Sequence, residues 1–426
     1  MEQGDSSMNK SWQKTTLGQH VELLTGYPFK SIEYTNDEKA MRLLRGDNVV
    51  QGSIRWDDVK RWGGSTETKI LRYFLKEGDF VIAMDRTWVK AGLKASMITK
   101  QDTPSLLVQR VARLRVKKGL YSKILPLLIR SHMFEQYVKG VQTETAVPHI
   151  SPQQINDFPV LLPPLPEQKA IADLLSTWDE AIEKIERLVK VQVKMLKQIS
   201  RWLLFGYKRL DNRKVNLSDG RYFKYPCDWE LLKISKIAKD ISARNGTSDE
   251  MVLSCSKYDG FVNSLDYFGK QVFSSDTSNY KVIKKGQFGY PSNHVEEGSI
   301  GLLEHCEKGI VSPIYVIFEV SKEKIYPPYL IKLLKTNIYK HIFQVTTSSS
   351  VDRRGGLRWI DFSKIRVPIP PLEEQQQIAE TLNAAQKEID LLRQLLDKYK
   401  SQKRGLMQKM LTGEWRVKPE MVMGYE

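Results

Sequence analysis

The chain has 426 residues, an ordinary globular composition and a formal charge of +16 at pH 7. Its 41% of hydrophobic residues argue against disorder, and no apolar run approaches the roughly 18 residues of a membrane helix. Three widely spaced cysteines match neither a zinc site nor a disulfide framework, so we expect no bound metal. The polar N-terminus lacks a signal-peptide core, which predicts a cytoplasmic protein without membrane segments.

An internal repeat organises the chain. LPPLPEQKAIADLL at 162–175 matches IPPLEEQQQIAETL at 369–382 at an offset of 207, and eight of the 14 positions are identical. A variable block precedes each copy. We therefore predict variable blocks alternating with helical segments. The predicted boundaries are 1–161 (first block), 162–210 (first helix), 211–368 (second block), 369–417 (second helix) and 418–426 (tail).

The first block combines short strands with a helix. GSIRW (52–56), DFVIAM (79–84) and VARLRV (111–116) are typical of strands, and YSKILPLLIRS (121–131) of a helix. Basic side chains beside Trp88 suit contacts with phosphate or base edges, although solvated surface charges remain the alternative. A histidine in TETAVPHIS (143–151) is either a further contact or structural. The DNA-binding candidates of this block are Arg86, Lys90, Lys94 and His149.

The first helical segment has the pattern of a coiled-coil seam. Its proline-rich start and Gly206 near its end mark helix boundaries. Positions spaced alternately by four and three residues from 171 to 203 are apolar except Gln192. The seam residues are Ile171, Leu175, Trp178, Ile182, Ile185, Val189, Leu196, Ile199 and Leu203.

The second half repeats this order. KVIKKGQFGYP (281–291) and IVSPIYVIFEV (310–320) are predicted strands, and YPPYLIKLLKT (326–336) matches the helix of the first block. The loop at 346–359 combines arginines, a Ser/Thr run and two glycines. The DNA-binding candidates of this block are Arg353, Arg354 and Arg358 in this loop, together with Asn293 and His294. The second seam contains Ile378, Leu382, Ile389, Leu392, Leu396, Leu406 and Met410.

Connectivity predicts the arrangement of these parts. If the ends of each block lie close together, the second helix starts beside the end of the first, and the two run antiparallel. The predicted fold is therefore α+β: two mixed blocks joined by two long antiparallel coiled-coil helices with a pseudo-twofold repeat. We expect a dumbbell with a block at each end.

Charge and motifs narrow the function. The basic excess lies mostly in two separate blocks, which favours two contacts with a polyanion such as duplex DNA. No phosphate loop, nucleophile elbow or metalloprotease motif occurs, so no catalytic residue is assigned. The alternatives are a coiled-coil adaptor with basic heads for acidic proteins and a stand-alone DNA enzyme. Strong salt dependence of duplex binding would favour a DNA reader over the adaptor.

The two PPL-initiated helices, ending in GLMQKMLTGEWRV (405–417), resemble the specificity subunit of type I restriction-modification systems. The resemblance implies that each block recognises one half of a split DNA site. It implies that the helices set the distance between half-sites and dock methyltransferase subunits. Two methyltransferase and two restriction subunits would join one chain. S-adenosylmethionine, ATP and magnesium would bind those partners.

The arginine-rich loop gives a first test. We expect Arg353→Ala and Arg354→Ala to weaken binding to cognate duplex. A phosphate contact would lower the salt slope by about one per residue, whereas a guanine contact would cost about 1 to 3 kcal/mol at one base pair. Titrations with cognate and single-base-variant duplexes at several salt concentrations separate these outcomes. Unchanged affinity, slope and base preference would remove the loop from the interface.

Overall fold

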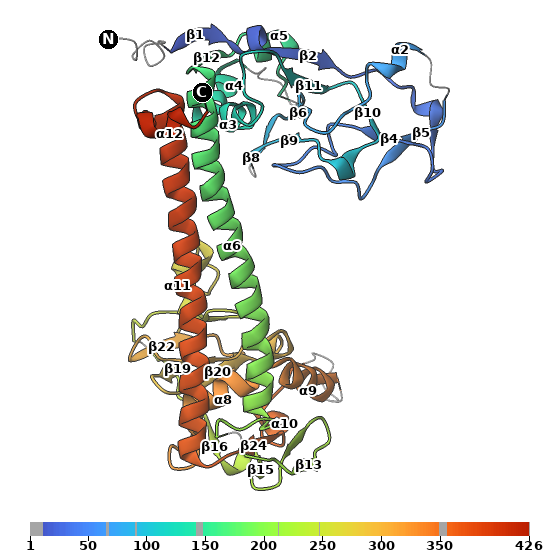
Figure 1. Cartoon of the computed structure of the whole chain (residues 1–426). Coiled ribbons are helices and arrows are strands. Elements are labelled where there is room, and N and C mark those ends of the chain that lie inside the picture. The colour runs from blue at the N-terminus through green and yellow to red at the C-terminus, as the bar shows by residue number, and fades with distance from the viewer. Residues whose placement is uncertain are drawn as a thin grey trace, which may run out of the picture. The chain divides into compact units, whose positions relative to one another are not determined.

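The computed structural model describes residues 12–64, 68–89, 92–141, 148–211, 213–246, 248–348 and 356–425. The chain forms two compact units, each with its own core (Figure 1). Unit 1 consists of Met1–Glu186 and Leu395–Glu426, and unit 2 of Arg187–Gln394. Each unit therefore contains part of both long helices.

Unit 1 is built on two four-stranded sheets. One has the antiparallel order β2–β11–β6–β9, and the other the order β10–β4–β5–β3, in which β10 and β4 are parallel. Two-stranded pairs join β1 to β12 and β7 to β8. The strands are β1 (Gln13–Thr16), β2 (Val21–Thr25), β3 (Tyr34–Thr35), β4 (Met41–Leu44), β5 (Lys60–Trp62), β6 (Phe80–Ala83), β7 (Trp88–Val89), β8 (Gly92–Leu93), β9 (Ala95–Met97), β10 (Ser105–Leu107), β11 (Val111–Val116) and β12 (Pro159–Leu162).

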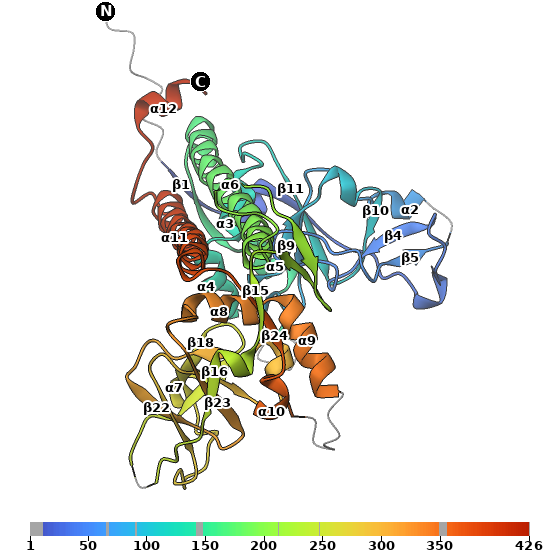
Figure 2. The same cartoon turned by 90° about the horizontal axis from the view of Figure 1, so that it is seen from below.

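Unit 2 repeats the central sheet as β16–β23–β20–β21, with α8 and α9 beside it (Figure 2). The pair β15–β24 corresponds to β1–β12: Glu230 faces Ile369 as Gln13 faces Leu162. The strands are β13 (Leu217–Asp219), β14 (Lys224–Pro226), β15 (Glu230–Lys233), β16 (Ala238–Ile241), β17 (Leu253–Ser256), β18 (Gly260–Asn263), β19 (Lys281–Lys284), β20 (Phe288–Pro291), β21 (Gly301–Leu302), β22 (Lys308–Val311), β23 (Tyr315–Val320) and β24 (Arg366–Ile369).

The helices follow the same repeat. The pair α3–α4 of unit 1 corresponds to α8–α9 of unit 2, and α5 to α10. The long helices α6 and α11 have 40 residues each. The helices are α1 (Leu17–His20), α2 (Thr68–Leu71), α3 (Ile124–Ile129), α4 (His132–Val141), α5 (Pro152–Asn156), α6 (Leu165–Leu204), α7 (Ser264–Phe268), α8 (Pro327–Leu334), α9 (Asn337–Ser348), α10 (Trp359–Phe362), α11 (Leu372–Leu411) and α12 (Pro419–Met423); short 3-10 turns are η1 (Ser31–Glu33), η2 (Lys100–Asp102), η3 (Ile234–Lys236) and η4 (Val295–Glu297).

The long helices pair antiparallel inside each unit. In unit 1, early residues of α6 meet late residues of α11: the rings of Trp178 and Tyr399 are 5.4 Å apart. In unit 2, Gln192 donates to Glu388 at 3.3 Å. The predicted α+β fold with paired antiparallel helices is therefore confirmed.

Glycines end both long helices, as predicted. Gly206 and Gly413 have φ values of +66° and +74°, in the left-handed region that glycine adopts without strain. A Cβ at position 206 would lie 2.3 Å from Pro226. Another residue at position 206 would therefore both strain the turn and displace its neighbour.

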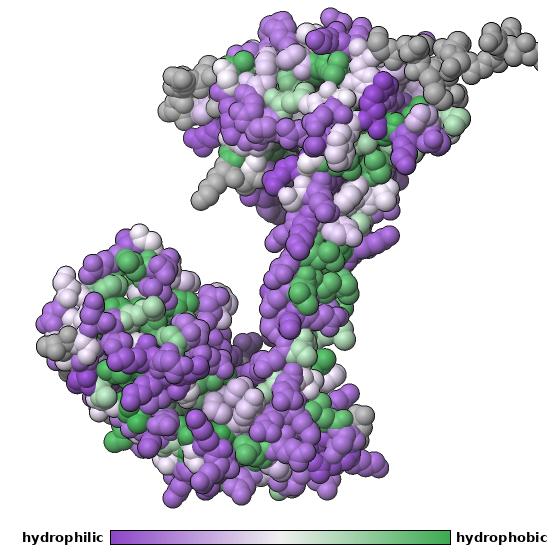
Figure 3. Space-filling model, turned by 90° about the vertical axis from the view of Figure 1, so that its left-hand side faces the viewer, coloured by the Kyte–Doolittle hydropathy of each residue, from purple (hydrophilic) through white to green (hydrophobic). Residues whose placement is uncertain are grey.

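An apolar stripe remains exposed on the paired helices. Leu188, Val191 and Met195 follow one another at i, i+3 and i+7 along α6, and Leu391 of α11 is exposed as well. All four belong to unit 2. Hydrophobic surface on the helices is visible in Figure 3. We call these four residues the apolar stripe. Their exposure leaves them available for contact with a partner.

An arginine–glutamate pair closes the helical pair in each unit. In unit 1, Arg416 lies just beyond α11 and donates to Glu167 in the first turn of α6, at 2.7 and 3.0 Å. In unit 2, Arg209 lies just beyond α6 and donates to Glu374 in the first turn of α11, at 2.5 Å. Arg209 also reaches Asp228 at 3.0 Å. Each start is thus tied to the end of the other long helix.

The neighbouring glutamines clamp the helix starts to the blocks. Gln168 accepts from the Tyr121 amide at 2.8 Å and donates to the Gly119 and Pro163 carbonyls. Gln375 repeats this, accepting from the Tyr326 amide at 2.8 Å and donating to the Lys324 and Pro370 carbonyls. Both glutamines are buried with these bonds made, so the Glu-Gln pair of the repeat has a structural role.

One predicted strand is wrong. Residues 52–56 contain only an isolated bridge between Ile54 and Val49. Gly52 has a φ of +76°, so the chain turns where the apolar pattern predicted a strand. The predicted run 310–320 is divided into β22 and β23 by a turn at Pro313. None of the helices in the described ranges is long and apolar enough to cross a membrane.

The different burial of the two closing arginines predicts that removing them destabilises the protein to different extents. The Arg209 side chain is 2% exposed, whereas that of Arg416 is 53% exposed. We expect Arg209→Ala to lower the free energy of unfolding by about 3 kcal/mol or more, because it leaves Glu374 without its buried partner. The matched variant Arg416→Ala should lower the free energy of unfolding by a smaller amount. Urea denaturation followed by tryptophan fluorescence measures both, and equal losses would contradict the burial argument.

Candidate nucleic-acid interface

Each unit brings two loops together at the end of its central sheet. In unit 1, the chain leaving β6 meets the segment entering α5: the Ile150 amide donates to Met84 at 3.0 Å and the Arg86 amide to Pro148 at 2.7 Å. In unit 2, the Leu357 amide donates to Ser292 at 2.7 Å, just after β20. The candidates proposed from sequence therefore come from equivalent loops of the two units.

In unit 1 the site centres on Asp85. His149 Nδ1 lies 2.6 Å from Asp85 Oδ1, and Arg110 Nε lies 3.8 Å from Asp85 Oδ2. The contact with Asp85 orients the imidazole of His149, which therefore has a structural role in the loop pair. A role in reading DNA stays a prediction.

Two exposed arginines at this site have unusual backbones. Arg86 and Arg110 have φ values of +48° and +69°, which are uncommon for residues with a Cβ. The Met84 amide donates to the Arg110 carbonyl at 2.8 Å. This hydrogen bond ties the turn at Arg110 to the segment that leads to Arg86. Such strain persists only where neighbours enforce it, and it concentrates at functional sites. Arg110 was not among the residues chosen from the sequence, because nothing in its local pattern sets it apart.

The remaining candidates of unit 1 differ in their surroundings. Lys94 is half-buried, and burial lowers its pKa while Asp47 opposes that shift. Its amide donates to Thr87 at 2.8 Å, which fixes it beside the β7–β8 pair. Lys90 lies outside the described residues, as do Arg353 and Arg354 of unit 2.

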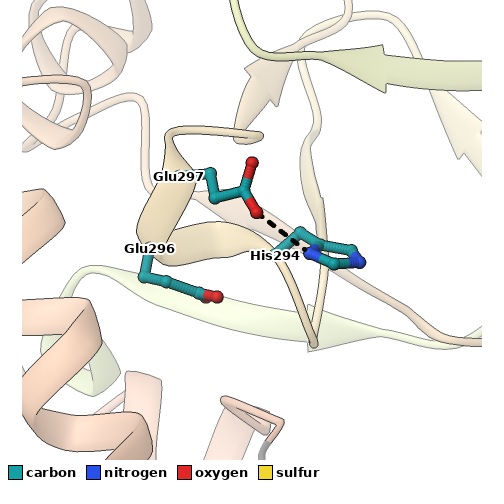
Figure 4. Close-up of side chains that lie close together, drawn as sticks. All are labelled: His294, Glu296 and Glu297. Carbon is teal, nitrogen blue, oxygen red and sulfur yellow. Dashed lines mark ion pairs between the residues drawn. The ribbon is translucent and has the colours of Figure 1, made fainter.

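In unit 2 the candidates lie around η4 and α10. Asn293 is half-buried, and exposed His294 has Nδ1 3.4 Å from Glu297 Oε1 (Figure 4). Arg358 is exposed and stands at the N-cap position of α10, where its side chain makes no capping hydrogen bond. Asn293 and His294 follow β20 as Asp85 and Arg86 follow β6, so the two units place different chemistry at equivalent positions.

His294 also belongs to a cluster with Glu296 and Glu297 (Figure 4). One ligand atom of each lies within 4.8 Å of the others, and within the described ranges this is the one such group. Two of the three residues are exposed and already form an ion pair with each other. The cluster is therefore an ordinary surface group and gives no basis for a metal site.

The residues predicted for the helix seam differ in their burial. Those that are buried are Ile171, Leu175, Leu203, Ile378, Leu382, Ile389 and Met410. Those that are half-buried are Trp178, Ile182, Ile185, Val189, Leu196, Ile199, Leu392, Leu396 and Leu406. Two polar residues have partners across the helical pair: Gln192 donates to Glu388, and Lys403 of α11 lies 2.5 Å from Asp179 of α6.

A family model described as "Type I restriction modification DNA specificity domain" matches residues 9–193 and 273–400, more than half of the chain. The chain belongs to this family. It is a specificity subunit of the type I restriction-modification class, and the specificity subunit is non-catalytic. The resemblance seen in the repeated helices is thereby confirmed.

Known proteins agree with this assignment. The chain is 34% identical over 192 residues to the type I restriction enzyme EcoAI specificity subunit of Escherichia coli, a match covering 44% of this chain but 31% of that relative. It is 23% identical to the EcoBI specificity subunit of Escherichia coli, over 98% of this chain and 90% of that one. A chain from a solved structure on assembly and conformational transition of the type I system shares the fold, with a TM-score of 0.58, 12% identity and coverage of 95% and 98%.

The strained arginine provides a test of the interface in unit 1. Asparagine tolerates the left-handed backbone, so Arg86→Asn should leave stability unchanged while removing the charge. We expect weaker duplex binding and a salt slope reduced by about one, measured by anisotropy titrations at several salt concentrations. Lys118→Asn, on an exposed turn after β11, is the charge-matched control. Equal effects of the two variants would show that Arg86 contributes only general charge.

Proposed function

We propose that this subunit recognises a split DNA target, with one half-site for each unit, and that the paired helices set the distance between the half-sites. The observation that carries the proposal is the repetition of the whole site. The central sheet, the loop pair at its end and the arginine–glutamate closure all occur twice. Two copies of one recognition device suit two half-sites.

The charge distribution supports duplex DNA as the ligand. The chain carries 66 basic against 50 acidic residues, and the excess lies mostly in the two blocks. Exposed Arg86 and Arg110 in unit 1, and exposed Arg358 in unit 2, offer contacts to phosphate or guanine. These groups lie on loops held by a sheet, which is where binding residues are commonly placed.

The apolar stripe supports docking of other subunits. Exposed leucine, valine and methionine at helical spacing are typical of a face that packs against another helix. In the proposed complex, two methyltransferase subunits dock on the helices and two restriction subunits join them. S-adenosylmethionine, ATP and magnesium then belong to those subunits, and the cytoplasm is the place of action.

Lengthening both helices tests the spacing role. A heptad inserted after Val189 alone should break the register with α11. A matching heptad after Leu396 should restore packing and add about 10 Å, or roughly three base pairs. Methylome sequencing of cells expressing the chain with its methyltransferase partner measures the spacer between half-sites. We expect the same half-sites with a longer spacer.

The outcomes of this test are distinct. Unchanged spacing in the doubly lengthened chain would contradict the helices as the determinant of half-site distance. Loss of one half-site would show damage to one unit. Absence of any methylated split target with the wild-type chain and its partner would contradict the proposed function itself.

A further inference from the structure

A third segment reaches the loop pair of unit 1. Residues 45–55 lie between β4 and β5 and turn at Gly52, whose φ is +76°. The Gly52 amide donates to the Ala95 carbonyl at 3.0 Å, and the Gln51 side chain donates to the Gly92 carbonyl at 3.3 Å. These hydrogen bonds fix the segment against β8 and β9. We call residues 45–55 the docked turn.

The backbone of the docked turn is held from inside by Asn48. This buried side chain accepts from the Arg45 amide at 3.0 Å and donates to the Arg55 carbonyl at 3.0 Å. The Arg55 amide in turn donates to the Asn48 carbonyl at 2.8 Å. Ile54 and Trp56 pack against the core, and Arg55 between them is exposed. The docked turn therefore presents Arg55 outward from a fixed backbone.

The docked turn brings Arg55 close to the candidates of the loop pair. Lys94 stands between β8 and β9, where the turn docks. Burial lowers the pKa of Lys94, the positive charges of Arg86 and Arg55 lower it further, and Asp47 and Asp85 oppose the shift. Side chains from the docked turn and from the loop after β6 therefore act on one amino group. With Arg110, which approaches Asp85, they form what we call the charge cluster: Arg55, Arg86, Lys94, Arg110, Asp47 and Asp85.

Both acids of the charge cluster already have partners. Asp47 lies 3.3 Å from Arg45, and Asp85 has His149 and Arg110 beside it. In the described ranges, the Arg55 guanidinium forms neither an ion pair nor a side-chain hydrogen bond. Its donors are therefore available to a ligand.

The mixed charges of the cluster favour base edges over phosphates. A phosphate group would be repelled by Asp47 and Asp85, whereas base edges present donors and acceptors side by side. Carboxylates accept hydrogen bonds from the cytosine amino group, and arginine donates two parallel bonds to guanine. An arginine on a fixed backbone suits the guanine contact, because less freedom is lost when the bonds form.

We propose that Arg55 recognises the edge of a guanine base in the half-site of unit 1. The inference rests on the proposed function and adds a specificity-determining residue to it. Arg86 and Arg110 remain candidates at the same site, whereas Arg55 reaches it from a part of the chain that the loop pair does not include. The guanidinium donates to guanine O6 and N7, a pair of acceptors that distinguishes guanine from the other bases in the major groove.

Methylome sequencing tests the assignment in cells that express the chain with its methyltransferase partner. Exchange of residues 12–160 for the block of another specificity subunit identifies the half-site of unit 1, as the one that changes. In the wild type, this half-site should contain a G·C pair. Arg55→Ala should relax one G·C position of it and leave the other half-site unchanged.

Two further variants separate geometry from charge. Arg55→Lys should relax the same position as Arg55→Ala, because lysine keeps the charge but lacks the two parallel donors. Lys118→Ala removes a charge from an exposed residue beyond the opposite end of β11 from Arg110, and should leave the motif unchanged.

Binding to a modified duplex tests the contact itself. A guanine with carbon in place of N7 (7-deazaguanine) still pairs with cytosine but lacks one of the two acceptors. Placed at the relaxed position, it should weaken binding by the wild-type subunit and its methyltransferase about tenfold, and should weaken binding by Arg55→Ala no further. Anisotropy titrations of both complexes measure this difference.

The opposing outcomes are distinct. A wild-type motif in Arg55→Ala, relaxed positions in both half-sites, or a half-site of unit 1 without a G·C pair would overturn the proposal. A uniform loss of affinity on all duplexes, with a salt slope reduced by about one, would assign Arg55 to a phosphate and overturn it as well. A lower melting temperature of Arg55→Ala would assign the side chain to the fold, with the same consequence. A wild-type chain and partner that methylate no split target would instead contradict the proposed function.

Discussion

The arginine–glutamate closure is the interaction on which each unit depends. Arg416 and Glu167 are 249 residues apart in sequence, and Arg209 and Glu374 are 165 apart. Each pair ties the start of one long helix to the segment after the end of the other, which requires an antiparallel arrangement. The adjacent glutamines bond three backbone groups each and join the helix starts to the blocks. A block therefore cannot shift along its helices without breaking buried hydrogen bonds.

The two units use one architecture with different electrostatics. Arg209, which closes unit 2, is buried and contacts two carboxylates, whereas Arg416 in unit 1 is half exposed; each guanidinium lies over a tryptophan ring, Trp229 and Trp12 respectively. Beside the helices of unit 1, Lys403 pairs with Asp179 and Lys400 with Glu186, whereas in unit 2 Gln386 stands at the position equivalent to Asp179. A structural repeat therefore does not imply equal charges at equivalent positions, and these two ion pairs of unit 1 are not found at the same places in unit 2.

The loop pair of unit 1 combines a fixed backbone with exposed side chains. Backbone hydrogen bonds from Met84, Arg86 and Ile150 hold the loops, and these bonds stabilise left-handed conformations at two exposed arginines. The guanidinium groups are thus presented from a fixed backbone, which lowers the entropy lost when a ligand binds. Unit 2 presents Asn293 and His294 from the equivalent turn. Different side chains on one scaffold are what two different half-sites would require.

The sequence by itself determined the helices, their seam, their terminal glycines and the repeat, because local periodicity and a constant offset of 207 residues encode them. It also led to the family. It did not reveal that Glu167 and Glu374 bind arginines, or that Arg110 accompanies Arg86. It predicted a strand at 52–56, where the chain turns at Gly52. These features were decided by the tertiary structure, because they depend on contacts between residues far apart in the chain, which no local pattern records.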